Sequence, residues 1–448
     1  MDFPKRQFIG KRTMLHSAFI RRMAFWGLDF IKGSPVAHHI KDLKRAFADP
    51  VVGRKLAQER LEEFLEYACA TTPFYKKFAG AKDLREFPVI QKRTIKDNCD
   101  DFLSSAYKKS DLVSVLTSGS YGMPFKFYLT KDKRVRQQAE VIYFNGWAGY
   151  EVGMRFVHTR THPTGRLRLF IKNTVVMNPS VINEEWLEKQ RQTLKNDKVE
   201  FIVGYPSAIT PIAKYCKSKG DKPAGFVLKG IVSGAEPLLE TSRGIIEEVF
   251  GCIVLDRYSA DELGVISHEC VKCKRHHINF TSYKIELLGI DRDEPVEPGE
   301  VGRVVVTDLF SHAMPLIRYD TGDLTAWSKE SCPCGMNVPT FEKIQGRTME
   351  VVCDPSGKVI IPFVITWLFQ DLFSSIIQYQ FVQETRDSYL IRLHVVEPFD
   401  GEDVLREQFQ KELGPDAHIS FEYVDSIPPL PSGKRPYIIN EFKRSSEV

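Results

Sequence analysis

The chain has 448 residues, which is more than one ordinary domain and predicts at least two. Hydrophobic residues make up 43% of it, enough for sizeable cores, and this excludes a largely disordered chain. Basic and acidic residues nearly balance at 62 and 58, and a formal charge of +4 over this length argues against a dedicated nucleic-acid binder.

The N-terminal region is basic and aromatic. Its segment 14–32 is amphipathic, with Arg21, Arg22 and Lys32 among apolar residues. We favour a helix that packs on the main body, and keep an interfacial helix touching anionic lipid as the alternative. No apolar run reaches the roughly 20 residues of a transmembrane segment, and the N-terminus lacks the features of a signal peptide. We therefore expect a cytoplasmic protein.

One short stretch, TSGSYGMP at 117–124, lies between two expected strands at 111–116 and 125–130. Its glycines let the backbone approach an anion, and its hydroxyl and N–H groups can then bind phosphate oxygens. It is not a Walker A sequence, because no Gly-Lys-Ser/Thr closes it. Taken alone, this stretch is more often an ordinary hairpin loop, so its meaning depends on the rest of the chain.

Strands and helices alternate in the following region. Strands are expected at 155–159, 201–206, 228–238 and 252–259, and helices at 134–147, 184–196, 208–219 and 241–250. This alternation predicts an α/β domain with mostly parallel strands, in which ligands bind at the carboxyl ends of the strands. The expected strands end in the polar turns TSGS, GYPS, SGAE and YSADE, which favours a functional interpretation of the first loop.

From Tyr283 onward the pattern changes to short β segments, which predict a β subdomain. A polar turn near Gly346 suggests a linker at 345–350. After it we expect a smaller α+β domain with helices at 361–373 and 401–413 and strands at 376–384, 389–396 and 418–424.

The nine cysteines include two close pairs. Cys270 and Cys273 form C-x-x-C, followed by His276 and His277, and Cys332 and Cys334 form C-x-C in a CPCG turn. In a reducing compartment such pairs are typical of a tetrahedral structural Zn²⁺ site. Free thiols packed by chance are the alternative.

These turns, in this order, resemble the adenylate-forming enzymes, the superfamily of acyl-CoA ligases and related adenylating enzymes. TSGSYGMP is similar to their phosphate loop, YSADELG (258–264) to their YGxTE segment, RYDTGD (318–323) to RxxTGD, GRTME (346–350) to the GRxxD hinge, and PSGKRPY (431–437) to the segment with the catalytic lysine. TTPFYKKF, LREFPVIQKRTIKDN and the Cys-rich insert resemble the phenylacetate–CoA ligase branch, including its capsular-polysaccharide-associated (CapK-like) members.

The resemblance covers essentially the whole chain and implies an architecture. A large nucleotide- and acyl-binding domain would span 1–345, a hinge 346–350, and a small mobile lid domain 351–448. It also implies two half-reactions. A carboxylic acid attacks ATP to give an acyl-adenylate and pyrophosphate, and a thiol, normally coenzyme A, then displaces AMP.

The family motifs imply a role for each matching residue. Lys434 would neutralise charge in the adenylation step, Glu262 would bind Mg²⁺, and Arg347 would sit at the hinge, ending at Glu350, and reach the ribose. Asp323 would accept hydrogen bonds from the ribose hydroxyls. The phosphates would bind Thr117, Ser118, Gly119, Ser120 and Gly122. The adenine would lie among Ser233, Gly234, Ala235, Glu236, Pro237, Tyr258 and Ser259, and the acyl group against Gly204, Tyr205 and Pro206.

The zinc ligands implied by the branch are commonly one Cys and one His from the first segment, together with the second pair. The candidates are therefore Cys270, Cys273, His276, His277, Cys332 and Cys334. Such a closed site would pin the YSADE segment to the RYDTGD segment.

Two departures from the family pattern bear on activity. Tyr121 stands where the family has a small Thr or Ser, and Asp261 where it has Thr or Ser beside the catalytic Glu; both changes disfavour ATP unless offset. They favour one alternative to a CoA ligase, a catalytically silent scaffold relative. A second alternative, an adenylating enzyme that transfers the acyl group to a carrier-protein thiol or an amine, is favoured like the ligase by the intact RYDTGD, Glu262 and Lys434. Family members are often dimers, so the resemblance also implies a homodimer.

Overall fold

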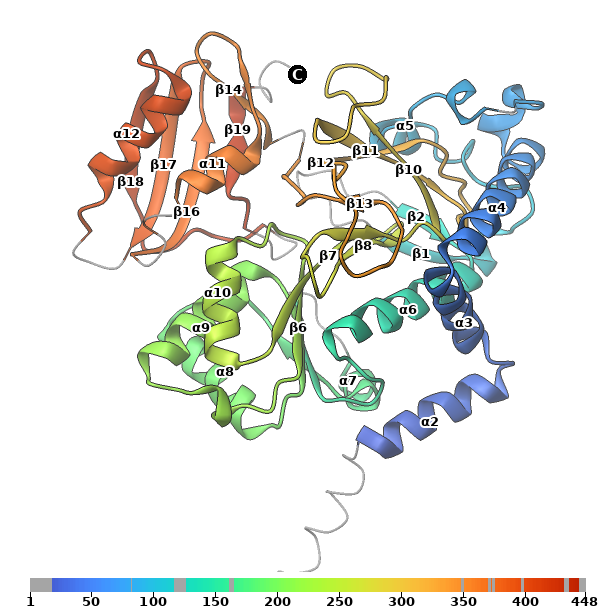
Figure 1. Ribbon diagram of the computed structural model, residues 1–448, viewed down its shortest axis with the longest axis horizontal. Helices are drawn as coiled ribbons and strands as arrows, with labels where there is room; N and C mark the ends of the chain where they lie inside the picture. Colours follow the sequence, from blue (N-terminus) through green and yellow to red (C-terminus); the bar gives the residue numbers. More distant parts are fainter. Residues whose placement is uncertain are drawn as a thin grey trace, which may run out of the picture.

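The protein is described here by a computed structural model (Figure 1). It describes residues 18–442, except 82, 117–125, 161–164, 348–349, 370–371, 373–374, 396–398 and 431–434. Within these ranges, no helix combines the length and apolar composition needed to cross a bilayer.

Helices and a hairpin form the N-terminal region. Asp49 caps the longest helix by accepting hydrogen bonds from the N–H groups of Val51 and Val52, which the first turn would otherwise leave unpaired. The helices are α2 (Ala18–Ile31), α3 (Pro35–Ala48), α4 (Pro50–Thr71) and α5 (Lys92–Asp97), and the antiparallel hairpin is β1 (Val113–Leu116) with β2 (Lys126–Leu129).

An eight-stranded sheet organises the large part of the chain, in the order β13-β9-β8-β7-β6-β5-β3-β4. Strands β4, β3, β5, β6 and β7 are parallel, and β8, β9 and β13 extend the sheet antiparallel. The strands are β3 (Phe156–Thr159), β4 (Thr174–Met177), β5 (Phe201–Gly204), β6 (Gly230–Gly234), β7 (Ile253–Ala260), β8 (Gly264–Glu269), β9 (His276–Ile278) and β13 (Thr340–Phe341).

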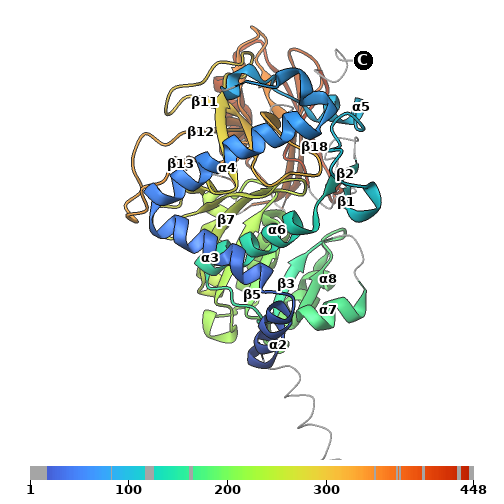
Figure 2. The same ribbon diagram turned by 90° about the vertical axis from the view of Figure 1, so that its right-hand side faces the viewer.

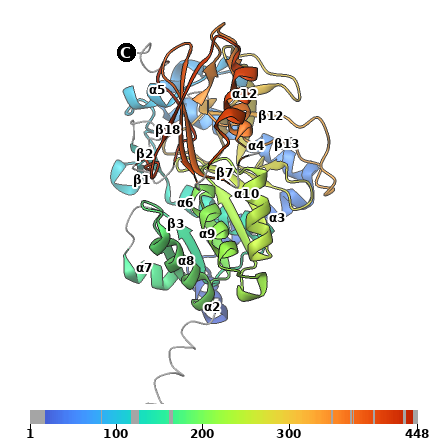
Figure 3. The ribbon, with the colours of Figure 1, turned by 90° about the vertical axis from the view of Figure 1, so that its left-hand side faces the viewer.

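Helices cover this sheet (Figures 1 and 3). Leu194, Ile212 and Ile246 of α8, α9 and α10 pack on strand residues such as Ile202 and Val254, which forms one buried core. The helices are α6 (Lys131–Asn145), α7 (Arg166–Lys172), α8 (Glu184–Asn196), α9 (Pro206–Ser218) and α10 (Glu240–Phe250).

A three-stranded antiparallel sheet follows, built from β10 (Tyr283–Leu288), β11 (Val301–Asp308) and β12 (Tyr319–Ala326). Its apolar side shares a large core with α3, α4 and the hairpin, which includes Phe64, Phe127, Val304 and Leu316. Figure 2 shows α4 lying across this region. Strand β12, which carries most of the RYDTGD segment, is thereby held against the body.

The C-terminal part has a hydrophobic core of its own, formed by residues between Val352 and Ile438. Its four-stranded sheet has the order β18-β17-β16-β19. The elements are β14 (Val352–Cys353), β15 (Val359–Ile360), α11 (Pro362–Leu368), β16 (Ile376–Gln383), β17 (Ser388–Val395), α12 (Glu402–Leu413), β18 (His418–Tyr423) and β19 (Ile438–Asn440). The exact domain limits at 345 and 351 stay a prediction.

The predicted fold class is confirmed: a mostly parallel α/β sheet, a β subdomain and a C-terminal α+β part. Two details differ from expectation. The helix expected at 361–373 ends at Leu368, and α7 with β4 was not expected. Helix α2 contacts the body through Arg22, which pairs with Glu151, yet most of its apolar side chains stay exposed.

Candidate active site

A buried tyrosine and an arginine hold the carboxylate of Asp323. Tyr258 Oη donates a 2.6 Å hydrogen bond to Asp323 Oδ2, and Arg347 Nε donates one of 3.1 Å to Asp323 Oδ1. A backbone bridge also pairs Asp323 with Arg347. Burial, and then the charge of Asp323, raises the pKa of Tyr258 well above its usual value, so its hydroxyl stays protonated as a donor. The structure thus brings three predicted nucleotide-binding residues together.

Glu262 lies in the tight turn between β7 and β8 and is 5% exposed. Tyr319 Oη donates a 2.8 Å hydrogen bond to its Oε1, and Lys92 Nζ lies 3.7 Å from the same oxygen. Gly264 closes the turn with φ of 116°, where a Cβ would lie 2.7 Å from Glu140 Oε2. The turn therefore places a carboxylate, a hard oxygen ligand suited to Mg²⁺, at the end of a central strand.

The segment Ser233–Pro237 comprises the last two residues of β6 and the turn after them, at the same end of the sheet. Ser233 Oγ is buried and has no hydrogen-bond partner among the described residues. Ala235 adopts φ of 68°, an uncommon conformation for a residue with a Cβ. A buried hydroxyl without a partner, next to a residue in an uncommon backbone conformation, is typical of a site that binds a polar ligand.

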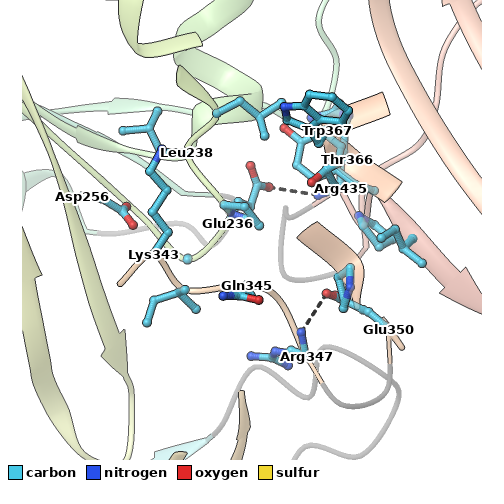
Figure 4. A pocket seen from close by; sticks show the side chains of 18 of the residues that line it. Glu236, Leu238, Asp256, Lys343, Gln345, Arg347, Glu350, Thr366, Trp367 and Arg435 are labelled. Atoms are coloured by element: carbon cyan, nitrogen blue, oxygen red, sulfur yellow. Dashed lines mark hydrogen bonds between the residues drawn. The ribbon is translucent and has the colours of Figure 1, made fainter. Parts of the chain in front are cut away.

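Glu236, in this segment, joins the two parts of the chain. Its carboxylate accepts hydrogen bonds from Ser207 N at 3.1 Å, Ser207 Oγ at 3.0 Å and the backbone N–H of Arg435 at 3.1 Å. The Arg435 guanidinium in turn donates to the carbonyls of Ile427 and Pro179 at 3.0 and 2.9 Å. The residue that follows Lys434 is therefore fixed against the large part (Figure 4).

A cavity of about 230 Å³ lies between the two parts. Glu236 and Arg435, which are hydrogen-bonded to each other, line it, and so do Arg347 and Glu350, where the backbone N–H of Arg347 donates a 3.1 Å hydrogen bond to the Glu350 carboxylate (Figure 4). The cavity is lined by predicted nucleotide residues on one side and by α11 and the segment before β19 on the other. It adjoins the Asp323 site without including Asp323, Tyr258 or Glu262.

The predicted acyl segment joins β5 to α9. Tyr205 N–H donates a 3.0 Å hydrogen bond to Thr159 Oγ1 on the neighbouring strand. A Cβ on Gly204 would lie 2.7 Å from the Thr159 side chain, so only glycine fits there. Pro206 begins α9. The three residues thus lie beside the end of β3.

The cysteine pairs meet in space, and the structure selects between the histidines. Cys270, His277, Cys332 and Cys334 offer ligand atoms that all lie within 4.8 Å of one another. Cys273 Sγ lies 3.0 Å from Cys332 Sγ. His276 points away from the thiols, with Nδ1 3.1 Å from Ser267 Oγ, because consecutive residues of β9 face opposite sides. Three thiols and an imidazole in this arrangement fit Zn²⁺.

Comparisons with known proteins find relatives of one kind. A family model described as the CapK C-terminal domain matches residues 352–441. A phenylacetate–coenzyme A ligase of Thermus thermophilus is 28% identical over 379 residues, covering 79% of this chain and 85% of that protein. Protein CapK of Staphylococcus aureus is 24% identical over 445 residues, covering 93% and 95%.

A solved structure shares the fold. The crystal structure of 2-hydroxyisobutyryl-CoA ligase in the postadenylation state, in complex with 2-HIB-AMP, superposes with a TM-score of 0.70 at 18% identity. It covers 87% of this chain and 90% of that chain. Over most of its length the chain is similar to members of the phenylacetate–CoA ligase-like branch of the adenylate-forming superfamily. The family resemblance found in the sequence is therefore confirmed.

Several predicted residues lie outside the described residues: Thr117, Ser118, Gly119, Ser120 and Gly122 of the expected phosphate loop, together with Tyr121, and Lys434. Of the two departures from the family pattern, only Asp261 is described. It is exposed at the tip of the β7–β8 turn, and its carbonyl accepts a 3.4 Å hydrogen bond from Gln137.

Some site residues were not expected from the sequence. Tyr319, Ser207 and Arg435 each contact a predicted residue, and Lys92 approaches Glu262. Tyr319 lies inside RYDTGD and Arg435 directly follows Lys434, so both could have been named as site residues from the motifs that contain them. Ser207 and Lys92 come from segments whose proximity only the folded chain shows.

Proposed function

We propose that this protein is an ATP-dependent carboxylate-activating enzyme, an AMP-forming acid–thiol ligase that makes an acyl-adenylate and then an acyl-CoA thioester. The observation that carries the proposal is the Asp323 carboxylate, held between Tyr258 and Arg347, with Glu262 on the turn that follows the strand of Tyr258. The proposal is supported by the similarity to a phenylacetate–coenzyme A ligase and to crystal structures of 2-hydroxyisobutyryl-CoA ligase in complex with 2-HIB-AMP, one of them also with CoA.

The nucleotide would bind at the carboxyl ends of β6, β7 and β12. A carboxylate has about four acceptor sites, so Asp323 can accept the ribose hydroxyls while it keeps its bonds to Tyr258 and Arg347. The segment Ser233–Pro237 would frame the adenine, with the unpaired Ser233 hydroxyl available to it. Bound through Glu262, Mg²⁺ would supply charge neutralisation at the phosphates.

Attack of a carboxylate on a phosphate brings two anions together, so it needs positive charge and alignment. Lys434 would supply that charge. The described neighbour, Arg435, is tied to Glu236 at the nucleotide-binding end of the sheet, which supports the interpretation that this arrangement serves the first half-reaction. The second half-reaction would require that this contact open, as expected for a mobile lid.

The group that accepts the acyl chain in the second half-reaction has two candidates. Coenzyme A is favoured by the relatives, and a carrier-protein thiol or an amine is the alternative. The approach of Lys92 to Glu262 favours, as a second candidate, a relative that no longer binds Mg·ATP, because a cation 3.7 Å from the proposed ligand competes with the metal.

The test is pyrophosphate release by the purified full-length chain with Mg·ATP and a panel of aryl, hydroxy and amino acids. We expect at least one acid to release pyrophosphate, and added coenzyme A to consume the adenylate. Turnover that needs hydroxylamine or a carrier protein instead of coenzyme A would support the alternative acceptor. No turnover, together with no ATP binding by calorimetry, would refute both enzyme functions and leave the silent relative.

A further inference from the structure

A group of basic side chains surrounds the end of β3, next to the predicted acyl segment. In the parallel sheet His158 pairs with Val203, Val203 with Val232, and Val232 with Leu255. Side chains paired across parallel strands point to one face, and the direction alternates along each strand. His158 and Arg257, which is two residues after Leu255, therefore lie on the same face, and Arg160 continues it just beyond β3.

These groups affect one another electrostatically. Burial, and then the charges of Arg160, Arg257 and Lys172, lower the pKa of His158 to about 4. His158 is thus neutral near pH 7 because it is enclosed and because cations surround it. Burial also lowers the pKa of Arg257 to about 10, which still leaves it charged.

The Asp256 carboxylate offsets part of the charge of Arg257, but the hydrogen-bonding groups of the two arginines are incompletely paired among the described residues. The buried Nε atoms of Arg160 and Arg257 have no hydrogen-bond partner among the described residues. Arg257 Nη1 donates to a neutral group, Asn145 Oδ1, at 3.1 Å. Residues 117–125 and 161–164, which adjoin β2 and β3 in the sequence, contain no Asp or Glu. Buried charge of one sign is costly unless an anion pairs with it.

The position of the group points to the acyl end of the site. Strand β3 lies next to β5, and Tyr205 bonds directly to Thr159, between His158 and Arg160. Burial, and then the charges of Glu236 and Asp261, raise the pKa of Tyr205 to about 12, and the nearby charge of Arg160 acts on it in the opposite sense. The residues that would hold the ribose, Asp323 and Arg347, lie on β12 and the expected hinge. They therefore come from different elements than Arg160, which directly follows β3.

We propose that the acid activated here carries a second anionic group, a carboxylate or a phosphate, which Arg160 and Arg257 bind while its first carboxylate is adenylated. The proposal rests on the proposed function, and it narrows the substrate class to dicarboxylates and phosphorylated carboxylic acids. Guanidinium groups suit both anions because they offer paired donors in a fixed plane.

The test compares acids in matched pairs: hexanoate with adipate, and glycolate with 2-phosphoglycolate. We expect the dianionic member of at least one pair to release pyrophosphate with a kcat/KM at least about tenfold higher, since one bidentate contact to a charged group is worth about that factor. Arg160→Gln and Arg257→Gln should remove this preference and leave the Kd for ATP unchanged. Arg155→Gln is the control, because Arg155 precedes the opposite end of β3 and pairs with Asp197.

Two further measurements keep the outcomes distinct. Calorimetry with adipate and with inorganic phosphate should show binding that Arg160→Gln weakens, and the pKa of His158, followed by NMR, should rise when the dianion binds. The inference would be overturned by a preference for monoanionic acids, or by arginine variants that weaken the binding of ATP and not the binding of the acid. Either result would leave the proposed function standing. If no acid is activated, the proposed function fails; the anion site then stands only if adipate or phosphate binding persists and is lost in Arg160→Gln.

An independent observation concerns the surface formed by α2 and α7. Among the described residues, nineteen large hydrophobic side chains are exposed, and nine of them lie on these two helices: Phe19, Ile20, Met23, Leu28, Phe30, Ile31, Leu167, Phe170 and Ile171. The helices lie side by side at one end of the molecule (Figures 1 and 2). Arg21 links them, with a 3.1 Å hydrogen bond to the Ile171 carbonyl and its guanidinium 4.8 Å from the Phe170 ring.

The charge on this surface is mainly positive, with Glu151, which pairs with Arg22, as an acidic neighbour. Helix α7 contains Arg166, Arg168 and Lys172 and no acidic residue. The only acidic residue of α2 is Asp29, which is buried and accepts hydrogen bonds from the N–H groups at the start of α3. An apolar surface bordered by cations complements an anionic lipid surface, where the apolar side chains enter the acyl region and the cations meet the headgroups.

From this complementarity we infer that α2 and α7 dock the protein on anionic membranes. The test is co-sedimentation with phosphatidylglycerol-containing vesicles and with neutral phosphatidylcholine vesicles. We expect binding only to the former, and at least about tenfold weaker binding after Phe30→Ser with Ile31→Ser. Val404→Ser, an exposed residue of α12, is the control. Equal binding to neutral vesicles, no binding, or a dimer that the double variant dissociates would overturn the inference.

Discussion

The backbone N–H of Arg435 donates a 3.1 Å hydrogen bond to Glu236 Oε1, across 199 residues of sequence. Because Glu236 follows β6 and Arg435 follows Lys434, this contact couples the position of the C-terminal part to the predicted nucleotide site. It provides a physical basis for separating the two half-reactions by mutation.

Glu236→Ala should slow adenylation by about 10- to 100-fold, because the carboxylate holds Ser207 and Arg435 through hydrogen bonds to a charged group, which contribute about 1.5–3 kcal/mol each. Thioester formation from a supplied acyl-adenylate should stay within about twofold, since that step would not use the contact. Glu240→Ala is the matched control: Glu240 lines the same cavity but bonds to Lys343. Equal loss of both steps would contradict the role of Glu236.

Tyr258→Phe should raise the KM for ATP by about five- to tenfold, the value of one hydrogen bond of about 1–1.5 kcal/mol. The Tyr258 hydroxyl donates a 2.6 Å hydrogen bond that orients the Asp323 carboxylate. The phenylalanine variant loses this bond and keeps the one from Arg347 Nε. Tyr423→Phe, which removes an exposed hydroxyl bonded to Glu402, controls for the substitution itself. An unchanged KM for ATP would mean that Asp323 does not meet the nucleotide.

Lys92→Met should lower the Mg²⁺ concentration needed for half-maximal activity by about two- to fivefold. The ammonium lies 3.7 Å from Glu262 and is 40% exposed, so the pair contributes at most about 1 kcal/mol after screening. Arg93→Met, on an exposed face of the same helix, should change nothing. If Lys92→Met raises the requirement, Lys92 assists phosphate binding and Glu262 is not its competitor for the metal.

Metal analysis should find about one zinc per chain, and Cys332→Ser should lose it and lower the melting temperature by several degrees. Cys332 lies within reach of Cys270 and Cys273 at 3.5 and 3.0 Å, so its loss opens the cluster. Cys69→Ser changes a thiol outside the cluster and should keep the zinc. A metal-free protein of full stability would show that the thiols are only packed together.

Much of the architecture could be predicted because it depends on local pattern. The helix expected at 184–196 has the bounds of α8, where Asn183 caps the first turn by accepting from Trp186 N–H. The apolar run of β5, which is buried along its whole length, likewise indicates a parallel strand covered on both faces. Helix α7 was missed because it has no side-chain cap and mixes basic and apolar residues in seven positions.

The sequence predicts which residues form the site better than it predicts which of them contact one another. His276 and His277 are equivalent in the sequence, and only the register of β9 with β8 shows that His277 faces the cysteines. Likewise, the proximity of Lys92 to Glu262 and of Arg435 to Glu236 depends on how separate layers pack. Such contacts between distant segments have no local signal.

Tyr121, in the expected phosphate loop, departs from the family pattern, and a substitution tests its role. Tyr121→Thr should speed pyrophosphate release if the ring only hinders a conventional loop, because a smaller side chain leaves room for the phosphates. Lost activity would mean that the ring is part of the site. Steady-state pyrophosphate release with saturating acid distinguishes the two results.

The central claim is that this chain adenylates a carboxylic acid with the help of Lys434. The most direct measurement is mass spectrometry of the acyl-adenylate formed from Mg·ATP and an accepted acid, by the unaltered protein and by Lys434→Ala. The account predicts the adenylate with the former and its near absence with the latter, while Lys434→Ala still converts a supplied acyl-adenylate with coenzyme A. No adenylate from the unaltered protein, or equal amounts from both, would contradict it.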